Sequence, residues 1–189
     1  MTRFTIRVIA GTLKGRRLES PSWEGLRPTS DRLRETLFNV LAPRIRGARV
    51  LDGYAGTGAI GIEAISRGAN RVTFVESDPR AQALIAGNLE RCEIREGCAI
   101  IRSAVGRALE TWRVDPAFAP FDIILLDPPY DQQPERVLAG VGAVVAPGGL
   151  IVLEHARRQA TPESLEHLTR VRQITSGDSV LSLYEPRPR

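Results

Sequence analysis

The chain has 189 residues, of which 42% are hydrophobic and 25% are charged, and its formal net charge at pH 7 is +4. A chain of this length buries roughly 70% of its unfolded surface, enough for one core, and its 17 Gly, 13 Pro and 2 Cys exclude collagen-like, disordered and disulfide-scaffold classes. The apolar runs are far shorter than the ~18 residues of a membrane span, and no signal peptide precedes them, so we expect a cytoplasmic protein without membrane association.

The positive charge is concentrated in the N-terminal quarter. Residues 1–49 carry ten Arg and one Lys against four acids, a net charge of +7, whereas the remaining 140 residues carry fifteen Arg against eighteen acids, a net charge of −3. A basic segment on a slightly acidic body favours contact with a polyanion such as nucleic acid. An ordinary solvated face would explain the same charges.

The N-terminal region predicts a small hairpin, a linker and a helix. Residues 5–10 and 16–20 flank a loop between two glycines and are typical of a short basic hairpin. Residues 21–28 contain Pro and Gly and form the predicted linker. Ser30 is a candidate N-cap for a helix with one apolar face, which Pro43 ends: Leu33, Leu37, Phe38, Val40 and Leu41. We therefore divide the chain into a basic N-terminal extension (1–28) and a main domain (29–189).

From residue 48 the patterns alternate between strand and helix. The predicted strands are 49–52, 71–76, 98–102, 122–127 and 149–154, and the predicted helices are 59–67, 79–91, 105–112 and 134–145. The end of the chain changes character, with a short helix over 162–168 and two strands over 170–175 and 179–185 that a tight turn makes antiparallel. The fold class is therefore α/β, a doubly wound (Rossmann-like) sheet of about seven strands with an antiparallel last strand, plus the N-terminal hairpin.

A glycine-rich loop follows the first of the alternating strands. Gly56, Gly58 and Gly61 satisfy the pattern GxGxxG between a strand and a helix, and Tyr54 lies in the same loop. Alone, this pattern fits NAD, FAD, S-adenosylmethionine or a structural turn. Asp52 at the strand end suits an ammonium group but would repel a pyrophosphate, and Glu76 at the end of the next strand suits ribose hydroxyls. Together they favour S-adenosylmethionine as the cofactor.

The sequence Asp-Pro-Pro-Tyr at 127–130 ends the fourth strand and carries the predicted catalytic residues Asp127, Pro128 and Tyr130. Two prolines hold the backbone extended, so the Asp127 carboxylate and a neighbouring carbonyl can both accept hydrogen bonds from one amino group. Tyr130 offers a ring on which a planar base can stack. Such acceptors orient the weakly nucleophilic amine of a nucleobase and stabilise the charge that develops on it. A simple turn after a strand is the alternative interpretation.

Metal chemistry is not expected. Cys92 and Cys98 are six residues apart without nearby Cys or His, and His155 and His167 are distant, so no zinc-like spacing is present.

These motifs resemble class I methyltransferases that modify amino groups. Segments 7–18 and 27–41, together with Gly177–Asp178–Ser179, resemble the RsmD family of bacterial guanine-N2 methyltransferases that act on small-subunit (16S) ribosomal RNA. The resemblance implies an assembling small subunit as substrate, cofactor binding by Asp52, Tyr54, Gly56, Gly58 and Glu76, and closure of Arg27, Pro28 and Thr29 over the site. Ser103 stands where related folds often place an acid against the adenine amino group.

The expected substrate is a looped-out or flipped base in RNA, because a paired base cannot present its amine. The candidate phosphate contacts are Arg7, Lys14, Arg16, Arg17 and Arg27. From its size we expect a monomer. The alternatives are a DNA or RNA adenine-N6 methyltransferase, an NAD-dependent oxidoreductase and a non-catalytic nucleic-acid-binding module.

Overall fold

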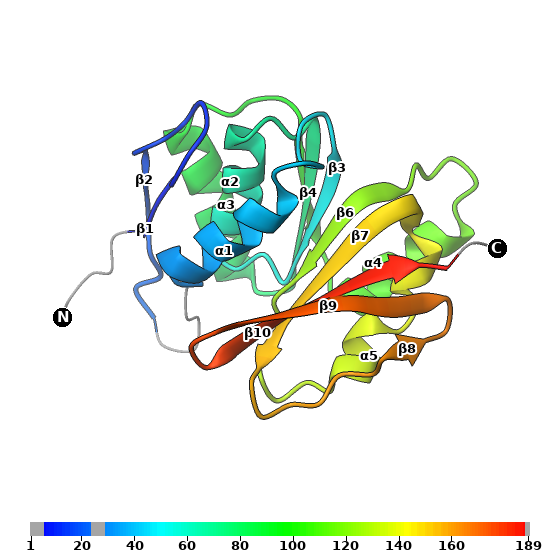
Figure 1. Ribbon diagram of the computed structural model, residues 1–189. Coiled ribbons are helices and arrows are strands. Elements are labelled where there is room, and N and C mark those ends of the chain that lie inside the picture. The colour runs from blue at the N-terminus through cyan, green and yellow to red at the C-terminus, as the bar shows by residue number, and fades with distance from the viewer. Residues whose placement is uncertain (1–5, 24–28, 188–189) are drawn as a thin grey trace.

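The computed structural model of the chain describes residues 6–23 and 29–187. Its elements (Figure 1) are, in chain order, β1 (Ile6–Arg7), β2 (Arg17–Leu18), α1 (Asp31–Leu41), β3 (Arg49–Gly53), α2 (Ala59–Ser66), β4 (Arg71–Glu76), α3 (Pro79–Arg91), β5 (Cys98–Arg102), α4 (Val105–Val114), β6 (Phe121–Leu126), α5 (Pro134–Leu138), the 3₁₀ turn η1 (Val141–Ala143), β7 (Val145–Ala156), β8 (Ser164–Leu165), β9 (Leu168–Ser176) and β10 (Ser179–Pro186).

One large sheet organises the molecule, with strand order β5-β4-β3-β6-β7-β10-β9-β8. Strands β3 to β7 pair in parallel, whereas β10 is antiparallel to both β7 and β9. The doubly wound α/β fold with an antiparallel end is thus confirmed. The sheet has eight strands because the two-residue strand β8 pairs with β9 at one edge.

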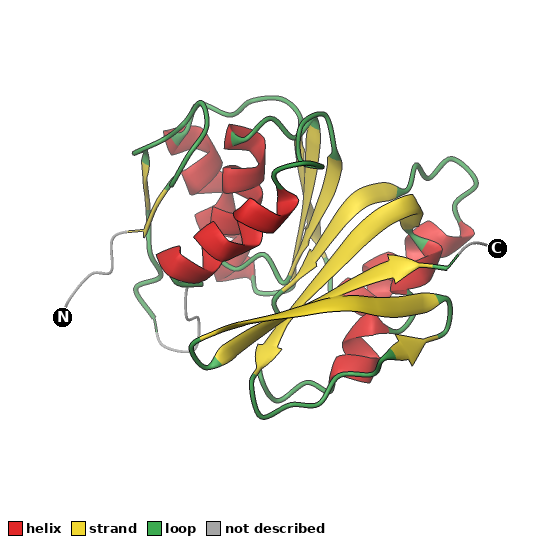
Figure 2. Ribbon diagram, viewed as in Figure 1, coloured by secondary structure: helices red, strands yellow, loops and turns green. Residues whose placement is uncertain are grey.

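Helices cover both faces of this sheet (Figure 2). Helices α1, α2 and α3 bury Phe38, Ile62 and Ile85 against one face, and α4 and α5 bury Leu109 and Leu138 against the other. The apolar run of β6 is buried on both sides, as expected of a central parallel strand. No helix in the described ranges combines the length and apolar character that crossing a membrane requires.

Helix α1 forms as its local sequence dictates. The Ser30 side chain accepts a hydrogen bond from the Leu33 N–H at 3.2 Å, and Asp31 places a negative charge in the first turn, where the helix dipole stabilises it. The predicted apolar positions are buried except Val40, which is half-buried. The helix ends at Leu41, just before Pro43.

Two predicted helices are wrong. The helix predicted over 134–145 ends at Leu138, because Gly140 adopts a left-handed conformation (φ +76°) and Val145 already begins β7. The helix predicted over 162–168 is absent. Its residues form β8 and a tight turn in which Glu166 has φ +50°, because strand pairing with β9 supplies backbone partners that an isolated short helix lacks.

The predicted hairpin is confirmed as the antiparallel pair β1–β2, and its loop is fixed to helix α2. The buried carboxylate of Glu63 accepts hydrogen bonds from the N–H groups of Ile9 (2.7 Å) and Ala10 (3.0 Å). Gly11 approaches the helix so closely that a Cβ there would lie 1.9 Å from the carbonyl oxygen of Ser66. The hairpin is therefore rigidly attached to the sheet through α2.

Candidate active site

The site lies between β3 and β6, at the topological switch point where the strand order of the sheet reverses. In such folds ligands bind at the carboxyl ends of the strands at this point. A narrow crevice, about 10 Å³ in volume, lies there and holds four polar side chains: Thr29, Asp52, Asp127 and Glu154. Its remaining lining is apolar and comes from α1, α2, β6, β7 and β10. This volume holds about one water molecule, so a planar base requires the crevice to widen.

The glycine-rich loop packs tightly against Asp52. Gly56 and Gly58 have φ values of +54° and +75°, and α2 begins directly after them. The Gly61 N–H donates to Asp52 Oδ2 at 2.8 Å. A Cβ on Gly61 would lie 2.2 Å from the Phe74 ring, so only glycine permits this close approach of helix and sheet.

Glu76 ties the end of β4 to the same loop. One carboxylate oxygen accepts the Gly56 N–H at 2.9 Å, and the other accepts the N–H groups of Ser77 (2.6 Å) and Asp78 (2.8 Å). These bonds fill three of the approximately four acceptor positions of a carboxylate. Glu76 therefore orders the loop, and about one acceptor position is left for a ligand.

The described lining of the crevice contains three acidic side chains and no cationic one. Burial raises the pKa of Asp52 to about 8, against the Gly61 N–H, which lowers it, and the charges of Asp127 and Glu76 raise it as well. In the described ranges no ion pair includes Asp52, Asp127 or Glu154. A buried carboxylate without a cation is costly, so the site fits a ligand that brings positive charge. S-adenosylmethionine, with its ammonium and sulfonium groups, meets that requirement.

The segment 127–130 forms a rigid loop at the end of β6. Asp127 accepts a hydrogen bond from the Thr29 hydroxyl at 2.7 Å. Pro128 is buried, and the carbonyl oxygen of Tyr130 accepts from the Gln159 side chain at 3.1 Å. Thr29 and Asp127, which lie 98 residues apart in the sequence, thus meet directly at the crevice.

Tyr130 contacts Glu154, which the sequence analysis missed, and Ser179, which it cited only for the family resemblance. The Tyr130 hydroxyl donates to Glu154 Oε1 at 3.2 Å and lies 2.9 Å from the Ser179 hydroxyl. Burial and the charge of Asp127 raise the pKa of Glu154 to about 8. The available signal was positional: Glu154 ends a predicted strand, as Asp52 and Glu76 do.

Comparison with known proteins identifies the family. The family model described as "Conserved hypothetical protein 95" matches residues 6–185. The Bacillus subtilis protein named "Putative rRNA methyltransferase YlbH" is 35% identical over 185 residues, covering 96% of this chain and 100% of that protein. "Ribosomal RNA small subunit methyltransferase D" of Haemophilus influenzae is 41% identical over 128 residues, 66% of this chain and 64% of that protein. The chain belongs to the RsmD-like methyltransferase family.

A solved structure supports this assignment. The Escherichia coli protein described as "Putative methyltransferase yhhF" superposes with a TM-score of 0.82 at 30% identity, over 98% of this chain and 100% of that chain. The resemblance seen in the sequence motifs is thus confirmed at the level of the family, and the fold as that of class I methyltransferases.

Two further candidate cofactor residues of this RsmD-like methyltransferase, Tyr54 and Ser103, follow the ends of β3 and β5. Tyr54 adopts a left-handed conformation (φ +63°), rare for a bulky residue, and its hydroxyl donates to Gln132 Oε1 at 3.0 Å. The Ser103 N–H donates to the carbonyl oxygen of Glu76 at 3.2 Å, and its hydroxyl donates to the Ala104 carbonyl. Ser103 therefore adjoins Glu76, and its hydroxyl oxygen remains able to accept a hydrogen bond.

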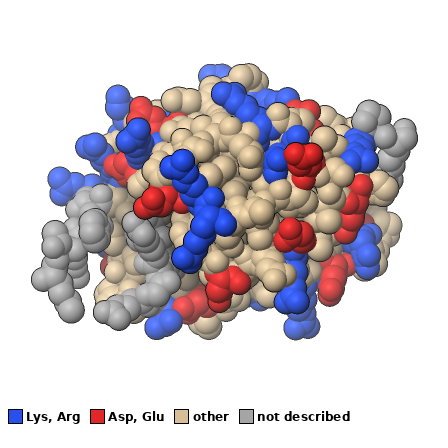
Figure 3. All heavy atoms as spheres, turned by 60° about the horizontal axis from the view of Figure 1, so that its bottom comes forward, with Lys and Arg blue, Asp and Glu red and all other residues tan. Residues whose placement is uncertain are grey.

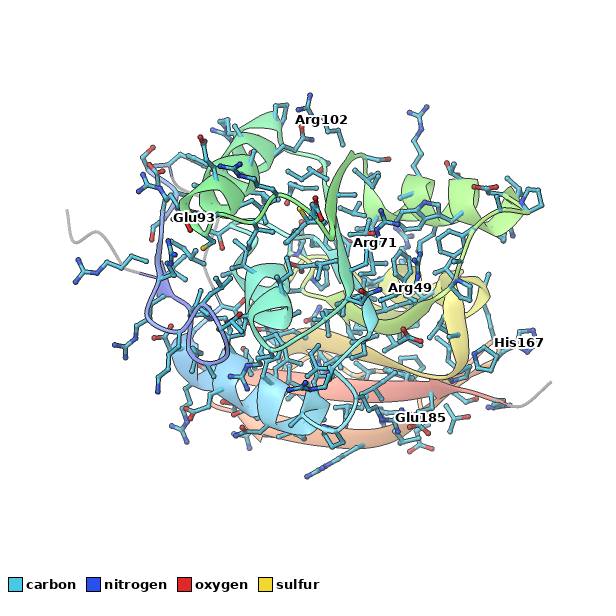
Figure 4. The ribbon with its side chains drawn as sticks, turned by 90° about the horizontal axis from the view of Figure 1, so that it is seen from above. Arg49, Arg71, Glu93, Arg102, His167 and Glu185 are labelled. Atoms are coloured by element: carbon cyan, nitrogen blue, oxygen red, sulfur yellow. The ribbon has the colours of Figure 1, made fainter. Side chains whose placement is uncertain are left out.

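The candidate RNA-binding residues of the hairpin differ in their partners. Arg16 pairs with Glu93 at 3.4 Å and donates to the Arg91 carbonyl, and Figure 4 shows Glu93 beside the hairpin. Arg7 lies 3.7 Å from Asp31, so its ion pair is weak. Within the described residues, Lys14 and Arg17 form no side-chain hydrogen bond or ion pair. Arg27 and Pro28 lie outside the described ranges.

The described residues give no sign of a metal centre. No group of three or more His, Cys, Asp or Glu side chains in them is arranged to hold a metal ion, and Cys92 and Cys98 are free thiols.

Proposed function

We propose that this RsmD-like methyltransferase transfers a methyl group from S-adenosylmethionine to the exocyclic N2 amine of a guanine in 16S ribosomal RNA. The observation that carries the proposal is the position of Asp127. It directly follows β6 and lines the same crevice as Asp52, so an acceptor for an amine and a carboxylate for a cationic cofactor lie at one switch point. The names of the relatives from Bacillus subtilis and Haemophilus influenzae support rRNA methylation.

The chain's own groups would prepare the amine for attack. The Asp127 carboxylate and a carbonyl of the diproline segment accept its hydrogens, which directs the nitrogen lone pair away from them and toward the cofactor. Tyr130, whose side chain is 42% exposed, stacks on the base. Asp127 or solvent takes the proton that the amine loses. Thr29 must release Asp127 before the amine can take its place.

The cofactor supplies an electrophilic methyl group on a positively charged sulfur. Asp52 would hold its ammonium group and Glu76 one ribose hydroxyl through the acceptor position that remains. The other proposed cofactor contacts are Tyr54, Gly56, Gly58, Ser103 and Thr29. Because Ser103 offers one hydroxyl in place of a carboxylate, we expect weaker recognition of the adenine amino group.

The RNA would be bound by the N-terminal extension, residues 1–28. Lys14 and Arg17 are the cations best placed for phosphates because they have no partner among the described residues, and Arg7, Arg16 and Arg27 complete the set. We propose an assembling small subunit as the substrate, because an unstacked base in an RNA loop is accessible there. We further propose that the protein binds it as a monomer.

The test is to incubate the protein with labelled S-adenosylmethionine and small subunits that lack the modification, and then to digest the RNA to nucleosides. We expect the label in N2-methylguanosine at a single position. Label in N6-methyladenosine would assign the site to the other class of exocyclic amine. No transfer to ribosomal RNA, with cofactor binding intact, would contradict the proposal.

A further inference from the structure

Glu154 has no role in the function proposed so far, although it lies beside the residue that carries it. Strands β6 and β7 are parallel neighbours in which Leu126 lies opposite Leu153. Asp127 and Glu154 each follow this pair by one residue, and both line the crevice. Glu154 is only 7% exposed, so the sheet register alone places two carboxyl groups next to each other in a buried site.

Glu154 anchors the aromatic ring at the mouth of the crevice. Its Oε1 accepts hydrogen bonds from the hydroxyls of Tyr130 (3.2 Å) and Ser179 (2.9 Å), and those two hydroxyls lie 2.9 Å apart. Much of the Tyr130 side chain is exposed, so this three-membered network is what restrains its ring. We expect a base to stack on that ring. The other oxygen of Glu154 is left to interact with Asp127.

Asp127 and Glu154 influence each other's ionisation. Both side chains line the same small crevice at the ends of neighbouring strands, so a charge on one disfavours a charge on the other. Burial raises the pKa of both, but the Thr29 hydroxyl and the contact with Glu154 stabilise ionised Asp127, whereas the charge of Asp127 raises the pKa of Glu154 to about 8. The hydrogen bond from Thr29 therefore favours Asp127 as the ionised acceptor and Glu154 as the member of the pair that retains a proton.

The surroundings of Glu154 contain nothing that would reverse this assignment. Ser179 and Leu181 face it from β10, the apolar Leu33 and Leu37 of α1 line the same crevice, and Asp52 lies on β3 beyond Asp127. None of the described Lys, Arg or His side chains forms an ion pair with Glu154. The titratable neighbours are therefore Asp127, Tyr130 and Asp52.

We propose that Glu154 is a positioning residue for methyl transfer, an inference that rests on the function proposed above. Its Oε1 accepts the Tyr130 and Ser179 hydroxyls, and its carboxyl group lines the crevice beside Asp127. One side chain thus keeps the amine acceptor and the stacking ring in a fixed relative position, which catalysis by orientation requires.

The kinetic test compares Glu154→Gln, Glu154→Ala and the control Glu163→Gln, an exposed residue remote from the crevice. For each protein, kcat and KM are measured from about pH 6 to 9.5. The wild type and the control should lose kcat above pH 8, by up to about tenfold per pH unit, as Glu154 loses its proton. Glu154→Gln keeps an oxygen for the Tyr130 hydroxyl but cannot ionise, so it should lack this decline, and Glu154→Ala should lower kcat at every pH with little change in KM for the cofactor.

A second measurement separates this inference from the proposed function. Carbon-13 NMR of carboxyl-labelled protein, without RNA or cofactor, should show one Glu resonance that titrates near pH 8. It should disappear in Glu154→Gln and titrate at lower pH in Asp127→Asn, which removes the neighbouring charge.

The outcomes are distinct. Superimposable pH profiles for active wild type and Glu154→Gln would overturn the positioning role, and the absence of a Glu resonance near pH 8 would overturn the raised pKa of Glu154. If no RNA is methylated while the NMR titration is as expected, the proposed function fails and the paired carboxyl groups are supported.

Discussion

Single carboxyl groups determine the chemistry of this site. Asp52, Asp127 and Glu154 come from three adjacent strands, and burial raises the pKa of each of them. On a surface, water would solvate such groups. In the crevice, their polar neighbours are backbone N–H groups, hydroxyl groups and the other carboxyl groups. A ligand that supplies positive charge or amine hydrogens therefore gains more free energy in this crevice than it would at an exposed carboxylate.

At this scale we predict that Asp127→Ala abolishes methyl transfer, with a loss of at least about 100-fold in kcat. Cofactor binding should persist, because Asp127 is expected to contact the base and not the ammonium group. Calorimetry with S-adenosylmethionine and single-turnover methylation measure the two effects. Glu110→Ala, on α4 across the sheet, is the control, and near-normal turnover in Asp127→Ala would remove that residue from the mechanism.

The raised pKa of Asp52 predicts that the free energy of unfolding depends on pH. Its pKa is raised from the usual 3.8 to about 8 in the folded protein, so the folded form retains a proton that the unfolded chain has lost between these values. The stability that Asp52 contributes is complete below about pH 4 and is lost as pH rises through 8, with a slope of at most about 1.4 kcal/mol per pH unit.

The substitution Asp52→Asn should remove this dependence. Asn keeps an oxygen for the Gly61 N–H but cannot ionise, so the ligand-free variant should be more stable than the wild type at pH 8 and should bind the cofactor poorly. Urea unfolding across pH 5 to about 8.5 gives the free energies. Parallel curves for Asp52→Asn and wild type would contradict the raised pKa, and Glu110→Gln is the control.

At the scale of elements, strand ends position the chemistry and helix α2 positions the RNA-binding hairpin. The Glu63 carboxylate that receives the hairpin also pairs with Arg67 at 2.7 Å, and the Arg67 guanidinium lies over the Phe38 ring of α1. Hairpin, α2 and α1 are therefore connected through buried polar contacts. A phosphate bound on the hairpin is held in a defined relation to the crevice.

We predict that Arg16→Gln with Arg17→Gln weakens RNA binding broadly and flattens its salt dependence. Loss of two phosphate contacts should reduce the slope of log K against log salt concentration by about 1.4 for single-stranded RNA. Arg107→Gln with Arg113→Gln, on exposed positions of α4, removes the same charge elsewhere. Filter binding at several salt concentrations provides the slopes, and an unchanged slope for the hairpin variant would exclude its role with phosphates.

Over the whole molecule, charge is more mixed than the N-terminal excess in the sequence implies. Figure 3 shows Lys and Arg spread over the lower face, with Asp and Glu interspersed among them. Arg7 and Arg16 each have acidic neighbours within 4.0 Å. The overall field therefore attracts RNA only weakly, and the few unpaired cations of the hairpin should carry most of the salt-dependent affinity.

The whole protein should be stabilised by its cofactor in a pH-dependent way. S-adenosylmethionine at 100 times its Kd should raise the unfolding free energy by about 2.7 kcal/mol. The increase in Tm at a fixed concentration should be larger at pH 8.5 than at pH 6, because ionised Asp52 binds the ammonium group more strongly. Thermal unfolding measures it, and an equal increase at both pH values, or a remaining pH effect in Asp52→Asn, would contradict this explanation.

Local patterns in the amino-acid sequence were sufficient to predict the alternation of strands and helices, the glycine loop and the family. These features are local, because hydrophobic period, N-caps such as Ser30 and the 127–130 segment all act within a few residues. The helices predicted from local patterns over 134–145 and 162–168 were wrong. There, a left-handed Gly140 and pairing with a neighbouring strand outweigh helical propensity.

The side-chain contacts within the site became evident only in the folded chain. The contact of Thr29 with Asp127, the pairing of Asp127 with Glu154 and the partners of Arg16 join residues between 27 and 98 positions apart. Such contacts depend on strand order and register, which no local pattern encodes. The protonation of the carboxyl groups depends in turn on burial, which exists only once the sheet and α1 enclose them.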